Sequence, residues 1–161
     1  MPILKQLREM LAEARIPYEV YNHALAYTAQ EIAQRQHVRG REMAKVVMVK
    51  ADHSYVMAVL PASRMLSLPR IKAVLNAKEI SLATEDEFAS MFPGCEIGAM
   101  PPFGNLFGLP VYVDPALEKD ETIFFNAGNH VQTVKLRYQD FKALVRPVVA
   151  SLTEERRKKA A

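Results

Sequence analysis

The sequence is poor in residues that mark several protein classes: it has no tryptophan, one cysteine and only 6 glycines among 161 residues. A single cysteine, Cys95, excludes an internal disulfide framework. No hydrophobic run approaches the roughly 20 residues of a membrane-spanning helix, and the first residues lack the apolar core of a signal peptide. We therefore expect a cytoplasmic protein with no membrane partner.

Motifs for metal and nucleophile chemistry are also missing. The sequence contains no HExxH, no GxSxG, no phosphate-binding GxxxxGK and no Cys/His pair at zinc-ligand spacing. Its histidines lie far apart, at His23, His37, His53 and His130. We predict no metal and no cofactor, and we interpret Cys95, beside a Pro-Gly turn, as an inert packing residue.

Composition indicates a single folded domain. Half of the residues are hydrophobic and 24% are charged, as is typical of a globular chain of this length. We place the domain at residues 1–150 and a charged tail at residues 151–161.

The net charge of +3 conceals three blocks of different sign. Before position 79 there are 12 Lys and Arg against 6 Asp and Glu, and from 79 to 121 there is one basic residue against 9 acidic ones. From 122 onward the counts are 8 basic and 3 acidic. Such a chain can place a positive face beside a negative one.

Hydrophobic periodicity predicts a mixture of helices and short strands. Apolar spacing predicts helices over 3–15, 28–36, 69–75, 84–92 and 138–145, and the capping-box sequences TAQE and TEDE open the second and fourth of these. Alternating or β-branched runs predict strands over 18–21, 44–50, 54–60, 111–113, 121–125 and 130–136. The strands cluster as hairpins rather than βαβ units, so we predict an α+β fold whose mixed, largely antiparallel, barrel-like sheet is flanked by helices.

Three features could carry chemistry. Lys45 lies at the entry of an apolar strand, where it either extends to solvent or binds a phosphate or carbonyl oxygen. The segment GAMPPFG at 98–104 combines glycines, which let backbone N–H groups approach a ligand, with prolines, which fix the loop. It is equally compatible with a rigid, well-packed loop. The segment NAGNH at 126–130 is either a plain hairpin turn or the floor of a pocket with His130 as a polar wall.

Together and in this order, these features resemble the YbaK-type family, which includes the editing domain of bacterial prolyl-tRNA synthetase and free-standing aminoacyl-tRNA deacylases. The resemblance covers about residues 15–145. The matching segments are His23 with TAQE at 28–31, AKVV at 44–47, GAMPPFG at 98–104, LPVYVD at 109–114 and FNAGNH at 125–130.

The resemblance implies an activity: hydrolysis of the ester that joins a wrong amino acid to tRNA, with neither a metal nor a protein nucleophile. It implies that Lys45, Gly98 and Pro102 are catalytic. The residues that it implies for substrate binding are Tyr27, Val47, Phe103, Gly104, Asn126, Gly128 and His130. The implied partners are the acceptor end of a mischarged tRNA and an aminoacyl-tRNA synthetase.

The late turn bears on the amino acid that is removed. It reads Gly128-Asn129-His130, whereas the branch of the family that acts on Cys-tRNA carries a basic, glycine-flanked turn there. We therefore expect a small amino acid such as Ala, or Ser or Thr, rather than Cys. The alternative is a non-catalytic module that binds tRNA or an aminoacyl nucleotide beside a synthetase, and a third reading is an unrelated small-molecule-binding domain.

The resemblance also gives the basic residues before position 79 a role. We expect them to form one positive face that meets the tRNA, with the acidic stretch 79–121 turned away from the phosphates. The residues expected to contact tRNA on this face are Arg35, Arg39, Arg41, Arg70 and Lys72.

Overall fold

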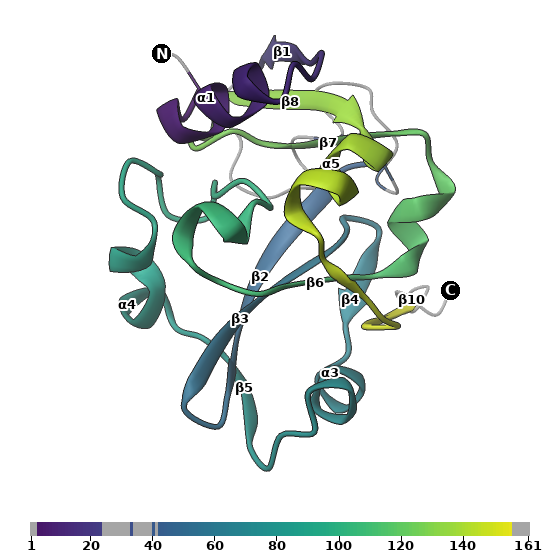
Figure 1. Cartoon of the computed structure of the whole chain (residues 1–161). Coiled ribbons are helices and arrows are strands. Elements are labelled where there is room, and N and C mark those ends of the chain that lie inside the picture. Colours follow the sequence, from purple (N-terminus) through teal and green to yellow (C-terminus); the bar gives the residue numbers. More distant parts are fainter. Residues whose placement is uncertain (1–2, 24–32, 34–39, 41, 156–161) are drawn as a thin grey trace, which may run out of the picture.

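The computed structural model describes residues 3–23, 33, 40 and 42–155, and Figure 1 labels its elements. The helices are α1 (Lys5–Glu13), α3 (Leu68–Leu75), α4 (Glu85–Phe88) and α5 (Tyr138–Val145), with 3-10 helices η1 (Ala89–Met91), η2 (Gly104–Phe107) and η3 (Pro115–Lys119). The strands are β1 (Glu19–Asn22), β2 (Ala44–Ala51), β3 (Ser54–Pro61), β4 (Arg64–Leu66), β5 (Ile80–Leu82), β6 (Val111–Val113), β7 (Thr122–Asn126), β8 (Gln132–Arg137), β9 (Val148–Val149) and β10 (Thr153–Glu155). Almost all of the helix expected over 28–36 lies outside the described residues.

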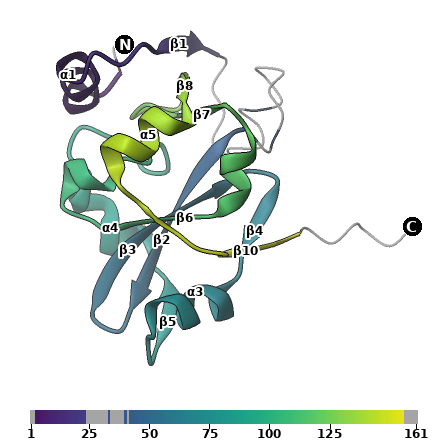
Figure 2. The same ribbon diagram turned by 45° about the vertical axis from the view of Figure 1, so that its right-hand side comes forward.

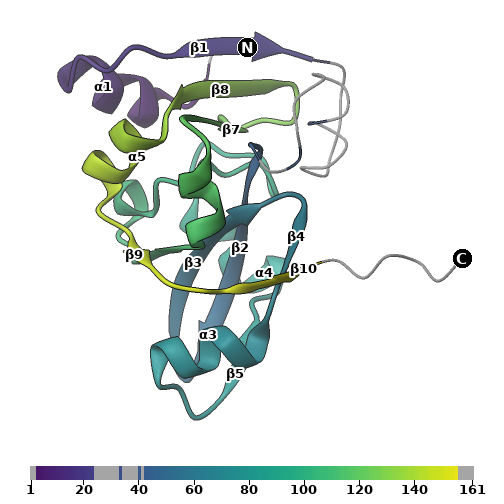
Figure 3. The ribbon, with the colours of Figure 1, turned by 90° about the vertical axis from the view of Figure 1, so that its right-hand side faces the viewer.

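The strands form three sheets, the smallest of which pairs β10 with β4. Five strands are ordered β5-β2-β3-β6-β9, with β2 antiparallel to β3 and β5, and β6 parallel to β3 and β9. A second, antiparallel sheet is ordered β1-β8-β7 and lies above one end of the first (Figure 3). A bridge between Met43 and Phe124 joins these two sheets. The predicted α+β class with a mixed sheet is confirmed, but the described strands do not close into the barrel that we expected.

The main core lies between the two larger sheets and is covered by α1 and α5. Strand alternation directs Ala44 and Met48 of β2 to this side. The ring of Phe103 lies 5.4 Å from that of Phe125 and 5.6 Å from that of Phe141, measured between centroids. The opposite face of β2 and β3 packs on α3 in a smaller cluster of Val49, Val56, Ala58, Leu60, Ile71 and Leu152.

The capping box predicted at the start of α4 is present. The Thr84 hydroxyl accepts a hydrogen bond from the Glu87 N–H at 3.2 Å, and the Glu87 carboxylate accepts one from the Thr84 N–H at 3.0 Å. The helix nevertheless ends at Phe88 and continues as the 3-10 turn η1. Phe92, the next residue, is not helical. Pro93 disfavours a helical conformation at the residue before it, so the segment is shorter than the predicted 84–92.

Asp114 fastens the C-terminal segment to the body of the protein. Its carboxylate is buried and accepts hydrogen bonds from the Ala116 N–H at 3.0 Å, the Leu152 N–H at 2.9 Å and the Thr153 hydroxyl at 3.0 Å. These contacts hold β10 beside β4 (Figure 2). Strand β10 therefore extends the folded part of the chain past residue 150, where we expected the tail to begin.

No helix in the described part of the chain is long and apolar enough to cross a membrane.

Candidate active site

The structure brings together two of the predicted segments, the glycine-proline loop and the turn between β7 and β8. The Glu96 N–H donates to the Gly128 carbonyl at 2.8 Å, and the Gly128 N–H donates to the Ala99 carbonyl at 2.9 Å. The Ala99 N–H donates to the Glu96 carbonyl at 3.0 Å, which closes residues 96–99 into a tight turn. A rigid junction results, with Gly98 at the tip of one turn and Gly128 in the other.

Gly98 and His130 face each other across this junction. Gly98 has a φ of +85°, a conformation that glycine adopts without strain, and a Cβ placed there would lie 3.5 Å from Cε1 of His130. His130 is only 5% exposed, and its Nε2 lies 2.8 Å from the Ile97 carbonyl oxygen. A carbonyl can only accept, so Nε2 carries the proton, and in the neutral ring Nδ1 does not.

The same hydrogen bond orients the backbone of the loop. In a planar trans peptide the C=O and the N–H point in opposite directions, so the bond from the Ile97 carbonyl to His130 turns the Gly98 N–H away from the ring. Among the described residues this N–H has no backbone acceptor. It is a fixed donor that a substrate oxygen can use.

The start of α1 braces the turn from the other side. The Leu4 N–H donates to the Ala127 carbonyl at 2.9 Å. A Cβ placed at Gly128, whose φ is +106°, would lie 3.3 Å from the Leu4 Cβ, and one placed at Gly94 would lie 3.1 Å from Cδ1 of the same leucine. Glycine at these two positions therefore lets α1 approach closely.

Polar side chains complete the turn. Asn129 Oδ1 accepts from the Val131 N–H at 2.9 Å, and its Nδ2 donates to Gln132 Oε1 at 2.8 Å. Gln132 in turn donates to Asn22 Oδ1 at 3.1 Å, which ties the turn to the end of β1. The side chain of Asn129 therefore has a structural role that the sequence analysis did not assign to it.

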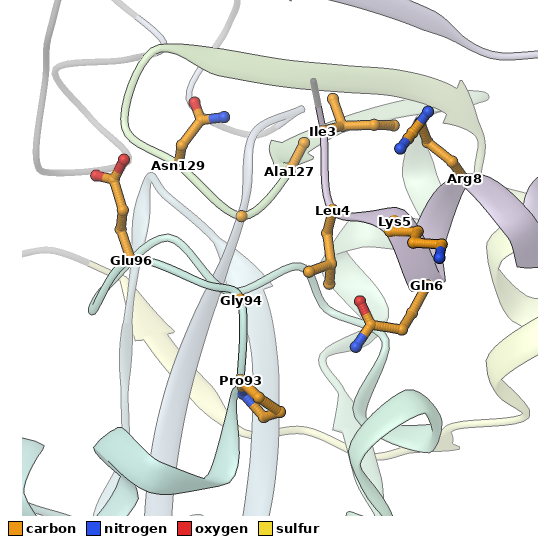
Figure 4. Close-up of a pocket in the computed structure, with 11 residues that line it drawn as sticks. Ile3, Leu4, Lys5, Gln6, Arg8, Pro93, Gly94, Glu96, Ala127 and Asn129 are labelled. Atoms are coloured by element: carbon orange, nitrogen blue, oxygen red, sulfur yellow. The ribbon is translucent and has the colours of Figure 1, made fainter. Parts of the chain in front are cut away.

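A groove of about 420 Å³ lies between this turn, the start of α1 and the loop before Gly98 (Figure 4). Its polar lining residues include Lys5, Gln6, Arg8, Glu96 and Asn129, and Gly94 and Gly128 form part of its surface. The groove therefore reaches Glu96, two residues before Gly98, and Asn129, the residue directly before His130.

Asn126 occupies the last position of β7, where it pairs with Thr133. It is 8% exposed, and its Oδ1 has no hydrogen-bond partner in the described structure. An unpaired buried amide oxygen costs about 1–3 kcal/mol, which a ligand with a donor group would recover. This geometry is compatible with the substrate-binding role predicted for Asn126.

Lys45 and Val47 lie at the start of β2, close to β7. Lys45 follows the Met43–Phe124 bridge by two residues and pairs with Leu60 of β3. Strand alternation places both side chains on the face opposite Ala44 and Met48, and Val47 packs against the smaller cluster beside α3. The predicted lysine is therefore at the end of the sheet that meets β7, while Val47 has the contacts of a packing residue.

The last residues of the loop, Pro102 to Gly104, pack against the core. Phe103 has no exposed surface and Pro102 is buried. A Cβ at Gly104 would lie 2.6 Å from Cγ2 of Val111 and 2.8 Å from the Leu109 carbonyl oxygen. In this conformation Phe103 and Gly104 pack against the core, and the direct substrate contact that we expected of them stays a prediction.

The two predicted tRNA-binding residues that the structure describes, Arg70 and Lys72, lie away from this junction. Arg70 and Lys72 lie on α3, at the end of the molecule opposite β7 and β8 (Figures 1 and 3), and Arg70 donates to the Ser151 hydroxyl at 2.8 Å. Four predicted residues, Tyr27, Arg35, Arg39 and Arg41, lie outside the described residues.

One residue of the acidic stretch 79–121, Glu96, lies beside His130, and the orientation of the stretch relative to the tRNA phosphates stays a prediction. Glu96 Oε2 lies 3.9 Å from Nε2 of His130, and the Glu96 side chain is 46% exposed. Sequence reasoning missed Glu96, although its place two residues before Gly98 was a usable signal.

The neighbouring Cys95 is a poor nucleophile, because burial raises the pKa of its thiol to about 11. Within the described ranges, no group of three or more His, Cys, Asp or Glu side chains is placed to hold a metal ion.

The fold and the site define a class: an α+β domain whose site is built from a glycine turn, a buried histidine and backbone donors. The sequence model of the aminoacyl-tRNA editing domain matches residues 23–144. The chain therefore belongs to the aminoacyl-tRNA editing domain family, and the resemblance found in the motifs is confirmed.

Two curated relatives belong to translation. The multifunctional Ser/Thr-tRNA deacylase ProXp-y of Escherichia coli K12 is 25% identical over 148 residues, which are 89% of this chain and 88% of that protein. The proline–tRNA ligase of Fervidobacterium nodosum is 33% identical over 87 residues, which are 54% of this chain and 15% of the ligase.

Solved structures show the same fold. The hypothetical protein APE2540 superposes with a TM-score of 0.84 at 18% identity, covering 93% of this chain and 100% of that one. A candidate trans-editing enzyme for prolyl-tRNA synthetase superposes with a TM-score of 0.80 at 20% identity, covering 93% of this chain and 96% of that one.

Proposed function

We propose that the protein hydrolyses the ester bond of mischarged aminoacyl-tRNA and that its substrates carry a small amino acid, Ala, Ser or Thr. Membership of the editing domain family supports the reaction class, and similarity to a Ser/Thr-tRNA deacylase over most of both chains supports the substrate. The structural observation that carries the proposal is the Ile97–Gly98 peptide, whose carbonyl is held by His130 so that the Gly98 N–H points away from the ring.

The ester needs little chemical activation. Water adds to the ester carbonyl, the carbonyl oxygen becomes an oxyanion, and collapse of this intermediate releases the amino acid and returns a proton to the ribose oxygen. A fixed N–H donor at the oxyanion lowers the barrier without reorganisation. In this proposal the Gly98 N–H is that donor, and the ribose hydroxyl next to the ester orients the water.

Other predicted residues position the substrate. Lys45, at the end of β2 that meets β7, holds a phosphate or orients the terminal nucleotide. Asn126 Oδ1, which has no partner among the described side chains, accepts a hydrogen bond from the substrate. His130 forms a polar wall, which its bond to the Ile97 carbonyl keeps in one tautomer.

The experiment compares the decay of Ala-, Ser-, Thr- and Cys-charged tRNA with and without the protein, in a buffer that contains a metal chelator. We expect faster loss of at least one of the first three esters, and a large loss of that rate in Lys45→Ala. Lys119→Ala, on the exposed end of η3, is the matched control and is expected to behave like the wild type.

The outcomes separate the candidate functions. A protein that binds charged tRNA in a salt-sensitive way without accelerating ester loss is the non-catalytic module. A protein with no effect on any of the four tRNAs contradicts the proposed function. Wild-type rates in Lys45→Ala contradict only the role of that lysine.

A further inference from the structure

We propose that Glu96 binds the α-ammonium group of the aminoacyl ester and thereby selects free amino acid esters over blocked ones. The inference rests on the proposed function, and it assigns a substrate-binding role to a residue that the motifs do not include.

Backbone hydrogen bonds fix the position of Glu96 at the start of the turn formed by residues 96–99. Its N–H donates to the Gly128 carbonyl at 2.8 Å, and its carbonyl accepts from the Ala99 N–H at 3.0 Å. The side chain is 46% exposed and extends along the rim of the groove, near Asn129 (Figure 4). The carboxylate can therefore reach a ligand while its Cα stays in place.

The Glu96 carboxylate has only a weak contact among the described residues. Its one ion-pair contact in the described structure is with His130 Nε2 at 3.9 Å, and that N–H already donates to the Ile97 carbonyl at 2.8 Å. A donor bound to another acceptor contributes little to a carboxylate at 3.9 Å. The Ile97 carbonyl, rather than Glu96, therefore holds the histidine ring.

Two other partly exposed carboxylates, those of Glu87 and Glu118, are held by hydrogen bonds and lysine contacts within the protein. Glu87 accepts from the Tyr55 hydroxyl at 2.7 Å and lies 3.1 Å from Lys50 Nζ. Glu118 accepts from Lys142 Nζ at 2.9 Å and from the Tyr138 hydroxyl at 3.2 Å. Glu96 has no such partners in the described part of the chain.

The substrate supplies the missing cation. An aminoacyl ester carries an ammonium group on the carbon next to the carbonyl, so the cation and the developing oxyanion are only a few bonds apart. Glu96 and the Gly98 N–H are likewise two residues apart on one tight turn. The Glu96 side chain is 46% exposed, so it can turn from the His130 side toward an ester held at the Gly98 N–H. A charge-assisted contact there adds selectivity for the charged amine.

The test uses two pairs of esters that differ only at this amine. Alanyl-tRNA is compared with lactyl-tRNA, and seryl-tRNA with glyceryl-tRNA, in which a hydroxyl replaces the ammonium group. For each ester, kcat/KM of Glu96→Gln is divided by that of the wild type, so the intrinsic difference in ester reactivity cancels.

For the aminoacyl esters we expect this ratio to fall about tenfold or more, the effect of losing a hydrogen bond to a charged group. We expect it to stay within about twofold of unity for the hydroxyacyl esters. Glu96→Asp should restore part of the loss. Glu85→Gln, an exposed acid in the first turn of α4, is the matched control and should leave both ratios near one. All variants are first shown to have the wild-type melting temperature.

Each result decides the inference. Equal losses on amino and hydroxy esters would show that Glu96 acts through His130 and would overturn the binding role. The absence of any loss would overturn it as well. A wild-type protein that hydrolyses none of these four esters and does not hydrolyse Thr-tRNA either would refute the proposed function itself, and the inference with it.

Discussion

Replacing Gly98 with alanine tests whether the glycine turn sets the reactive geometry. Gly98 has a φ of +85°, and a residue with a side chain pays about 1–2 kcal/mol to adopt a left-handed conformation. The added Cβ would lie 3.5 Å from His130 Cε1, an ordinary contact that adds little repulsion. We therefore expect Gly98→Ala to lower the free energy of unfolding by about 1–2 kcal/mol.

The same strain should also reduce activity. If the turn relaxes toward a negative φ, the Ile97–Gly98 peptide rotates. The hydrogen bond between the Ile97 carbonyl and His130 is then lost, and the Gly98 N–H no longer points toward the substrate oxygen. Misplacement of a reacting group by about 1 Å can cost about 100-fold in rate. We expect kcat/KM for the best charged tRNA to fall about 10- to 100-fold.

Gly108→Ala separates the two effects. Gly108 has a φ of +70°, and a Cβ there would meet no described atom within 4 Å, so the variant carries similar backbone strain away from the site. Stability is measured by urea unfolding followed by far-UV circular dichroism, because the chain has no tryptophan. We expect similar losses of stability in both variants and a loss of activity only in Gly98→Ala. Equal deacylation rates in the two variants would refute the role of the turn.

Three further predictions concern stability and reactivity. Asp114→Ala leaves the donors of Ala116, Leu152 and Thr153 without their acceptor and should cost about 3–4 kcal/mol in urea unfolding, whereas Asp114→Asn, which keeps one oxygen, should cost about half as much. Because burial raises the pKa of the Cys95 thiol to about 11, iodoacetamide at pH 8 should alkylate it about 100-fold more slowly in the folded protein than in urea; equal rates would contradict this. Hydrogen bonds from the Thr84 backbone and from Tyr55, and the ion pair with Lys50, lower the pKa of Glu87 from 4.5 to about 2, so its contribution to stability is complete above pH 4.5 and is lost as the pH falls toward 2. Glu87→Gln should therefore flatten the dependence of the urea midpoint on pH in this range, and an unchanged dependence would contradict the assignment.

Much of the fold follows from local sequence. The apolar, β-branched runs of β2 and β3 are visible because both faces of these strands are buried, and the period of α1 and α5 is visible because each helix buries one face. The short strands β4, β5, β9 and β10 were missed, since strands of two or three residues carry too few positions for a period. Strand β6 is equally short, and it was predicted from its Val-Tyr-Val sequence. The pairing of the missed strands depends on distant contacts such as that of Asp114 with Leu152, which no local pattern contains.

The candidate site was predictable in its parts but not in its arrangement. Gly98 and His130 were identified by residue type and order, because glycine and histidine have distinctive chemistry. Glu96 and the Ile97 carbonyl were not, since a backbone acceptor has no sequence signature and Glu96 was assigned to an acidic stretch facing away. Arg70 was placed on one tRNA-contacting face with the arginines before it, because charge along the chain was taken as charge on one face. Its helix, α3, lies at the end of the fold opposite β7 and β8, and its contact with tRNA stays a prediction.

The contact of Leu4 with the β7–β8 turn has a practical consequence for anyone who excises this domain. The family match begins at residue 23, so a fragment cut at that boundary would lose α1, the leucine that fills the space between Gly94 and Gly128, and the hydrogen bond to the Ala127 carbonyl. The fragment would retain every motif residue yet have lost the support of the turn that carries them. The residues that match the family model therefore make a shorter fragment than the one expected to be active. Helix α1 should be kept in any transplanted or minimised version of the domain.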